Sequence, residues 1–154
     1  MLVLHLKSGP RGYPERKKQW AALDTILTGL LETAQHDADI IVLGDFNNVS
    51  DDRTREFLPL LERLGYHWTG TEDTLLITEY WQPDWQQPEL KGSGIDQIVV
   101  SDDAKIEYME NSLRVGGICS KRAPGFSGEF PKYYRTISDH CPVIVTFRAF
   151  PDDD

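Results

Sequence analysis

The sequence predicts a single α/β domain, and three stretches near its start indicate this class. Alternation over residues 2–7 predicts a strand, and amphipathic periodicity over 15–36 predicts a long helix. The nearly all-apolar run at 39–44 predicts a strand that is covered on both faces. The 154 residues suffice for a real core, and neither an internal repeat nor a linker divides them. We therefore expect one domain over residues 1–150 and an acidic tail at 151–154.

Periodicity justifies the first strand and the long helix. In LVLHLK, Leu2, Leu4 and Leu6 share one face, and the residues between them share the other. The helix then follows a loop, and Pro14 suits its first turn. Its apolar residues recur at helical spacing, at Trp20, Leu23, Leu27, Leu30, Leu31 and Ala34.

A second helix is predicted to begin after the apolar run at 39–44. Ser50 or Asp51 would cap it, and it would run to about residue 63. Gly65 would stop this helix, and we expect Pro59 to interrupt it.

Strands dominate the rest of the predicted domain. The strand-like stretches are 66–68, 74–80, 94–101 and 142–148. Two long stretches without clear periodicity, 81–94 and 116–136, are read as loops. Loops of that length in a compact domain are usually functional or disordered.

Composition narrows the class of protein. A formal charge of −9 does not favour long-range attraction to nucleic acid or to an anionic membrane. No apolar run approaches a membrane span, and the first residues do not form a signal peptide, so the compartment stays open. The two cysteines, Cys119 and Cys141, could pair, but a small buried thiol is the favoured interpretation of Cys141.

Reactive residue types gather at the tips of the predicted strands. They lie in the segments LHLKS, GDFNN, GSGIDQIVVS and SDHCPV, with a basic loop before the last. An aspartate beside a histidine can fix the imidazole tautomer, and acids and amides at strand tips can hold a hard cation. These groups suffice for phosphodiester hydrolysis. Motifs for a serine hydrolase, a P-loop or a dinucleotide site are absent from the sequence.

The ordered set HLKS, GDFN, IDQIVVS and SDH-x-PV resembles the C-terminal half of the endonuclease/exonuclease/phosphatase superfamily, the deoxyribonuclease-like phosphoesterases. The resemblance spans residues 3 to 147. It implies a mixed β-sheet with flanking helices, which is half of the family's four-layer α/β sandwich. It also implies divalent-metal-dependent hydrolysis with Mg²⁺ or Mn²⁺.

The resemblance assigns roles to individual side chains. Asp45 would orient or deprotonate the attacking water, and Asn47 would bind the scissile phosphate and help to place Asp45. His140 would stabilise the charge of the transition state, held in orientation by Asp96. His5 would contact the phosphate or protonate the leaving oxygen. The implied metal ligands are Asp45, Asn47 and Asp139. From the residues themselves, Lys7 would share a strand face with His5 and add a contact to the substrate.

One departure from the family pattern bears on activity. The family's first half supplies a glutamate that is the main metal ligand. Neither Glu15 nor Glu32 occupies a segment that could replace it. We therefore expect the N-terminal half of the family fold to be absent from this chain. Alone, the remaining half would expose an apolar sheet face, so we also expect a homodimer or a partner that supplies the other half.

The sequence leaves the substrate open. Nuclease-like phosphodiester hydrolysis is the favoured function. The alternatives are a phosphomonoesterase or sphingomyelinase-type enzyme, and a non-catalytic binding module. Aromatic residues of the two loops (Trp81, Trp85, Tyr133 and Tyr134) could stack on nucleic acid or pack onto their own domain. Basic residues there (Lys121, Arg122, Lys132 and Arg135) could face a phosphate backbone or solvent.

Overall fold

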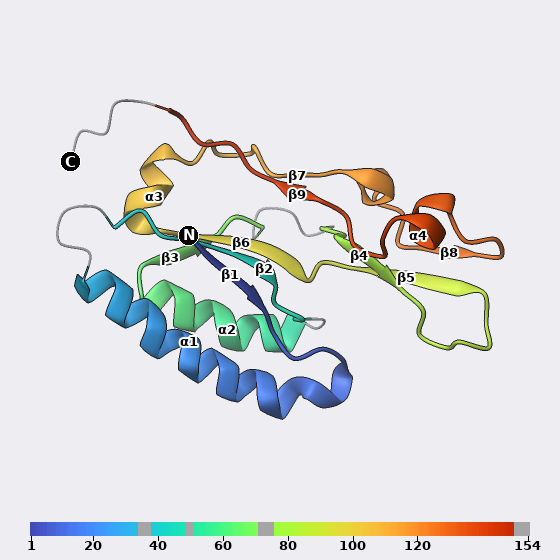
Figure 1. Ribbon diagram of the computed structural model, residues 1–154, viewed down its shortest axis with the longest axis horizontal. Coiled ribbons are helices and arrows are strands. Elements are labelled where there is room, and N and C mark those ends of the chain that lie inside the picture. Colours follow the sequence, from blue (N-terminus) through green and yellow to red (C-terminus); the bar gives the residue numbers. More distant parts are fainter. Residues whose placement is uncertain (34–37, 49–50, 71–75, 150–154) are drawn as a thin grey trace.

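The structure is a computed structural model that describes residues 1–33, 38–48, 51–70 and 76–149. Figure 1 shows that the two larger β-sheets lie roughly end to end along the long axis, with two helices beneath one of them. The predicted α/β class, mixed sheets with flanking helices, is confirmed. The predicted cap at Ser50 and the acidic tail at 151–154 lie outside the described residues.

The larger sheet, here called the central sheet, has four strands in the order β1-β2-β6-β3. Its strands are β1 (Leu2–His5), β2 (Ile41–Asp45), β6 (Asp96–Ser101) and β3 (Tyr66–Trp68). β1 and β2 run parallel because α1 crosses between them, whereas β6 is antiparallel to both of its neighbours. The sheet is therefore mixed.

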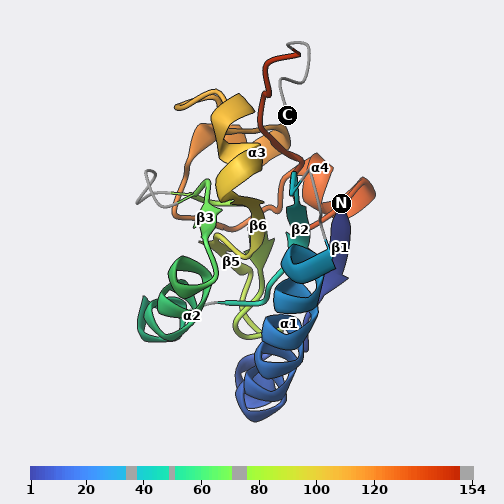
Figure 2. The same cartoon turned by 90° about the vertical axis from the view of Figure 1, so that its left-hand side faces the viewer.

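The second sheet, here called the outer sheet, is a three-stranded antiparallel sheet in the order β4-β5-β8. Its strands are β4 (Glu79–Trp81), β5 (Glu89–Ser93) and β8 (Gly125–Ser127). A short antiparallel pair, β7 (Arg114–Val115) and β9 (Val143–Ile144), lies on the other side of the central sheet from the two long helices (Figure 2).

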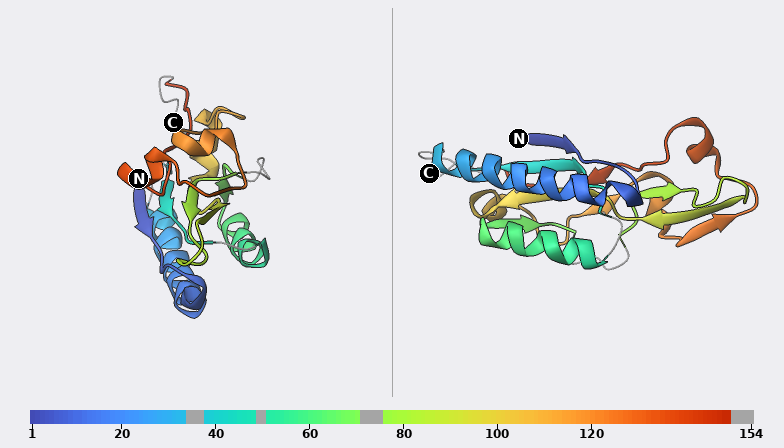
Figure 3. Two further views of the ribbon diagram at one scale, coloured as in Figure 1. Left: turned by 90° about the vertical axis from the view of Figure 1, so that its right-hand side faces the viewer. Right: turned by 90° about the horizontal axis from the view of Figure 1, so that it is seen from below.

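The described helices are two long ones and several short ones. They are η1 (Pro10–Gly12), α1 (Tyr13–Thr33), α2 (Asp51–Arg63), α3 (Asp102–Glu107), η2 (Gly117–Lys121) and α4 (Lys132–Thr136). α1 and α2 run side by side along one face of the central sheet (Figure 3). Across the described residues, no helix combines the length and apolarity that a membrane span requires.

The main core lies between these two helices and the central sheet. α1 buries Trp20, Leu23 and Leu27, which recur at intervals of three and four residues as predicted. The Trp20 ring stacks on Phe57 of α2 with 5.4 Å between ring centroids. Phe46 lies 5.5 Å from the same Phe57 ring, so the residue after β2 anchors the end of that strand in the core.

The opposite face of the central sheet is only partly covered. Ile98 and Val100 are buried there under the chain around β9, together with Val143 and Val145. On the edge strand, Val3 stays 63% exposed. This face therefore exposes less apolar surface to solvent than the sequence led us to expect, although the edge strand still exposes an apolar side chain.

The structure corrects several predicted elements. The strands predicted at 74–80 and 142–148 are shorter, covering Glu79–Trp81 and Val143–Ile144. The stretches read as loops at 81–94 and 116–136 contain β5 and β8. These strands pair through their backbones while carrying sequences such as ELKGS, so apolar alternation could not reveal them.

The second helix also departs from its prediction in one respect. α2 ends before Gly65, which has a φ of 71°, as predicted for a glycine stop. Pro59 lies inside the helix and does not interrupt it, and its ring is exposed to solvent.

The favoured interpretation of Cys141 as a free thiol is wrong. Cys119 and Cys141 form a disulfide, with 6.1 Å between their Cα atoms. Both residues are buried in a small core under the outer sheet, together with Tyr80 and Leu90. The bond therefore ties η2 to the segment that carries His140.

Candidate active site

Three of the predicted site residues lie in one row across the central sheet. The backbone register pairs His5 with Asp45, and Asp45 with Asp96. Paired residues project on the same face of a sheet, so the three side chains are neighbours at the ends of β1 and β2 and at the start of β6. His5 Nε2 lies 3.3 Å from Asp45 Oδ2.

This polar row continues directly from an apolar one. Two residues earlier along β1 and β2, the register pairs Val3 with Leu43, and Leu43 with Ile98. The site row therefore occupies the face opposite α1 and α2, at the point where the apolar cover of that face ends. This placement explains the abrupt change from apolar to polar residues in the sequence IIVLGDFN.

The geometry of β2 explains why its motif begins with glycine. Gly44 has a φ of 139°, and a Cβ placed there would lie 1.9 Å from the Leu4 carbonyl oxygen of the neighbouring strand. Only glycine permits this approach. Gly44 thus brings the end of β2 close to β1 and sets His5 beside Asp45.

Asn47 completes a tight turn that holds the Asp45 carboxylate. The backbone N–H of Asn47 donates to Asp45 Oδ1 at 2.8 Å, and its side-chain Nδ2 donates to Oδ2 at 2.7 Å. The same Nδ2 also donates to the Leu6 carbonyl at 2.9 Å. Asn47 has a φ of 53°, a left-handed conformation that asparagine tolerates better than most residues. Both oxygens of Asp45 are therefore fixed in orientation.

His140 reaches the row from the C-terminal part of the chain. Its Nδ1 lies 2.9 Å from Asp96 Oδ2 and 3.1 Å from Oδ1. Because a carboxylate only accepts hydrogen bonds, Nδ1 carries the proton and Nε2 is directed elsewhere. The side chain of His140 is 35% exposed, so it remains accessible to a ligand.

Thr78 links the backbones that carry Asp96 and His140. Its buried hydroxyl accepts from the N–H groups of Ile95 and Asp96, at 3.1 Å and 3.0 Å. Its carbonyl accepts from the N–H of Cys141 at 2.7 Å. Thr78 and the disulfide at Cys141 therefore fix the position of His140 relative to Asp96.

Glu79 is a site residue that the sequence analysis missed. It is buried, and its Oε2 lies 3.7 Å from His140 Nε2, on the opposite side of the imidazole from Asp96. Ser93 Oγ donates to Glu79 Oε1 at 2.5 Å. The available signal was weak, namely one acid inside the strand-like run TLLITEY. Its partner Ser93 is fourteen residues away in a stretch read as loop.

The local environment shifts the pKa of three of these groups. Burial raises the pKa of Asp45 above its ordinary value, an effect that the Asn47 backbone N–H partly offsets and the neighbouring Asp96 reinforces. Burial likewise raises the pKa of Glu79. Burial lowers the pKa of His140, but the hydrogen bond and charge of Asp96, followed by Glu79 and Asp139, outweigh it and raise the pKa overall. The cluster therefore favours a protonated His140.

Two predicted site residues, Asp139 and Lys7, lie at the margin of the cluster. The Asp139 side chain is exposed, and its backbone carbonyl accepts from the N–H of Tyr80 at 3.0 Å. Lys7 lies just beyond β1, and a Cβ on Gly12 would meet its Cγ at 2.9 Å, so its stem runs toward Gly12. Buried Arg16 donates to the carbonyl of Lys7 at 2.6 Å and fixes this turn of the chain.

The donors of the cluster suit a hard divalent cation in kind, because they are carboxylate and amide oxygens. A metal site also requires that several such side chains meet at one point. Within the part of the chain that the structure describes, no three His, Cys, Asp or Glu side chains converge as ligands of one ion.

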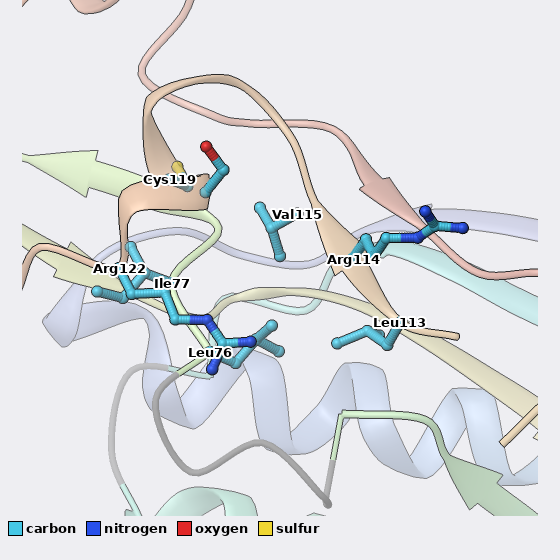
Figure 4. Close-up of a pocket in the computed structure, with 8 residues that line it drawn as sticks. Leu76, Ile77, Leu113, Arg114, Val115, Cys119 and Arg122 are labelled. Carbon is cyan, nitrogen blue, oxygen red and sulfur yellow. The ribbon is translucent and has the colours of Figure 1, made fainter. Parts of the chain in front are cut away.

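A separate cavity of about 230 Å³ lies beside the disulfide (Figure 4). Its lining is mostly apolar, with two arginines: Leu76, Ile77, Leu113, Arg114, Val115, Cys119, Ser120 and Arg122. None of the cluster residues described above contributes to this lining. We take the cluster as the candidate site because the described lining of this cavity includes neither a carboxylate nor a histidine.

Comparison with known families identifies the family of the chain. The model of the endonuclease/exonuclease/phosphatase family matches residues 3–140, which is most of the chain. The chain therefore belongs to this family of metal-dependent phosphoester hydrolases. A search of curated proteins found no match.

Proposed function

We propose that this protein hydrolyses phosphodiesters in a nuclease-like reaction that depends on a divalent metal ion. The observation that carries the proposal is the convergence of His5, Asp45, Asp96 and His140 from four distant segments onto one end of the central sheet. The polar groups are oriented by one another, as a preorganised site requires. Membership of a hydrolytic family supports the reaction class.

In this proposal Asp45 positions the attacking water. Its two oxygens are held by Asn47, and burial raises the pKa of its carboxyl group, which makes the ionised form a better proton acceptor. The water oxygen forms the new bond to phosphorus, and its proton passes to Asp45. The bond from phosphorus to the leaving oxygen breaks, and His5, whose Nε2 is exposed beside Asp45, protonates that oxygen.

His140 is assigned to the phosphate. Asp96 occupies Nδ1, and Nε2, which lies 3.7 Å from Glu79 Oε2 and beyond hydrogen-bond distance of it, donates its proton to a phosphate oxygen. The raised pKa of His140 keeps that charge available as negative charge builds up on the phosphate. Asp96 acts through His140 by holding the ring, and Lys7 is retained as a further substrate contact.

The proposed metal is Mg²⁺ or Mn²⁺, with Asp45, Asn47 and Asp139 as the side chains of this chain that would hold it. Such an ion would polarise the phosphate and neutralise part of its charge. We further propose that the remaining ligands come from a second copy or from a partner chain that meets the apolar edge near Val3. Light scattering tests this, and a monomer that retains full ion-dependent activity would contradict it.

One observation favours a second candidate, a non-catalytic module that binds phosphoesters. Among the described residues, no group of three or more His, Cys, Asp or Glu side chains is placed to hold one metal ion. Ion binding separates the two candidates, since a ligand that binds only the folded state raises the melting temperature. A melting temperature that does not respond to Mg²⁺ or Mn²⁺ favours the binding module.

The substrate class is tested with four compounds under the same conditions. Plasmid DNA and bis-p-nitrophenyl phosphate represent diesters, p-nitrophenyl phosphate a monoester, and sphingomyelin the lipid branch. Each is incubated with Mg²⁺, with Mn²⁺ and with EDTA. We expect ion-dependent cleavage of plasmid DNA and of bis-p-nitrophenyl phosphate. Preference for the monoester or for sphingomyelin would replace the nuclease-like assignment with the corresponding alternative.

A further inference from the structure

The exposed face of the outer sheet continues directly from the catalytic cluster. Glu79 and Trp81 are two residues apart on β4, so their side chains project on the same face. The register pairs Glu79 with Ser93 and Trp81 with Lys91. The contact of Glu79 with His140 shows which face this is. Trp81 and Lys91 therefore form the next row of the sheet beyond the cluster.

The other face of the same strands is buried. Tyr80 and Leu90 point away from this row into the core around the disulfide, and Phe126 packs against Tyr80 there. Trp81, by contrast, is 38% exposed, and Lys91 is exposed beside it. An exposed indole next to an ammonium group on a rigid strand pair is a surface that favours a flat ring with a nearby negative charge.

We propose that Trp81 and Lys91 form a subsite for one nucleotide of a single-stranded nucleic acid, the base stacking on Trp81 and Lys91 facing the adjoining phosphate. This deepens the proposed function and rests on it for the position of the scissile phosphate at His140. Two residues of strand separate the Glu79 and Trp81 rows, about 7 Å, which is within reach of a base attached at that phosphate.

Charge limits the length of this subsite. On β5 the next residue of the same face after Lys91 is Glu89, which is paired with Ser127. Its carboxylate would repel a further phosphate, and the chain as a whole carries a formal charge of −9. Affinity must therefore come from stacking more than from long-range attraction. A base that stacks on a side chain must be unstacked from its neighbours, so single strands are favoured over duplexes.

Binding is measured by fluorescence anisotropy with a labelled deoxyadenosine oligonucleotide, in EDTA so that no cleavage occurs. The control ligand is a strand of equal length whose sugars lack bases, which keeps the phosphates and removes stacking. We expect Trp81→Ala to weaken binding of the base-bearing strand by roughly 5- to 150-fold, the equivalent of stacking one base. The base-free strand should bind wild type and Trp81→Ala equally.

Matched variants separate stacking from folding. Trp81→Phe keeps an aromatic face and should retain most of the affinity. Trp85→Ala removes the same residue type from the loop between β4 and β5, outside the Trp81–Lys91 row, and should change affinity less than twofold. Equal binding of both strands by wild type, or an unchanged affinity in Trp81→Ala, would overturn the subsite.

The outcomes for the subsite and for the reaction are distinct. Base-dependent binding that needs Trp81, without cleavage in Mg²⁺ or Mn²⁺, keeps the subsite and removes the proposed hydrolysis. Ion-dependent cleavage of DNA that Trp81→Ala leaves unchanged in both KM and kcat keeps the hydrolysis and removes the subsite. Tight binding of duplex in preference to the single strand contradicts the single-strand assignment.

Discussion

The two sheets position their site residues in different ways. At the end of the central sheet, His5, Asp45 and Asp96 are neighbours because the backbone register places them in one row. At the outer sheet, Glu79 and His140 are paired by a single antiparallel backbone bridge, which the Thr78 hydrogen bonds and a disulfide support. The comparison teaches that continuous strand pairing positions the first group, whereas a single bridge with added hydrogen bonds and a disulfide positions the second.

Among the variants that compare the two regions, the largest effect is expected at His140, the residue that joins them. His140→Gln removes the cation assigned to the phosphate, and we expect turnover of bis-p-nitrophenyl phosphate to fall by about 10²- to 10³-fold. Asp96→Asn, which acts only through the ring, should lower turnover less and shift the pH profile of kcat. Initial rates measured from pH 5 to 9 check both.

The chain contains a matched control for this pair. His67 Nε2 contacts Asp102 Oδ1 on the surface between β3 and α3, so it reproduces the same chemistry away from the cluster. His67→Gln should leave turnover unchanged. An equal loss in His67→Gln and His140→Gln would mean that the effect is general destabilisation.

The next prediction concerns the contribution of the disulfide to the stability of the outer region. Replacing both Cys119 and Cys141 with serine removes a link across 22 residues and should cost about 2 to 4 kcal/mol in the free energy of unfolding. Urea titration of wild type, oxidised and reduced, and of the double variant measures it. An unchanged unfolding midpoint in the reduced protein would show that the outer region does not depend on this bond.

Tyr66 tests the central region at high pH. Burial raises its pKa to about 12, from 10 in the unfolded chain. The contribution of the protonated hydroxyl to the free energy of unfolding is therefore complete below pH 10 and is lost as the pH rises through 12, on the order of 3 kcal/mol. Tyr66→Phe should remove this loss, as followed by urea unfolding between pH 8 and pH 12.

Tyr80 provides the comparison from the outer sheet. Its hydroxyl donates to the Ala123 carbonyl at 2.6 Å, whereas the buried Tyr66 hydroxyl has no hydrogen-bond partner among the described residues. At neutral pH Tyr80→Phe should cost about 1 kcal/mol, and Tyr66→Phe should be neutral or slightly stabilising. The reverse order of costs would contradict these contacts.

The smallest effect is expected from the charge of Glu79. Burial raises the pKa of Glu79, so folding favours the protonated form of its carboxyl group. The folded state is therefore stabilised by this group at pH values below the ordinary pKa range of glutamate, and the stabilisation is lost as the pH rises. Glu79→Gln mimics the protonated group and keeps the hydrogen bond from Ser93. It should therefore be more stable than wild type at pH 7, with a difference that shrinks as the pH falls to 4. Thermal melts at both values measure this, and a less stable variant at pH 7 would contradict it.

The structure brings together several of the candidate residues that short sequence motifs indicate. Asp45 and Asn47 form their turn through contacts two residues apart, whereas Gly44 approaches Leu4 of the neighbouring strand, and the pairing with that strand places His5 beside Asp45. Glu79 and the Cys119–Cys141 bond could not be predicted in this way, since they depend on strands with little apolar pattern. Lys7 illustrates a further limit: its shared face with His5 assumed a strand to residue 7, but β1 ends at His5. Its substrate contact stays a prediction.

The measurement that tests the central claim most directly is hydrolysis of bis-p-nitrophenyl phosphate by wild type and Asp45→Ala, each with Mg²⁺, Mn²⁺ or EDTA. Circular dichroism confirms that both are folded. The account predicts ion-dependent turnover by wild type that Asp45→Ala loses, because the oriented carboxylate that receives the water proton is gone. Wild-type turnover in Asp45→Ala would contradict the mechanism, and a folded wild type inactive with both ions would leave the binding module as the better account.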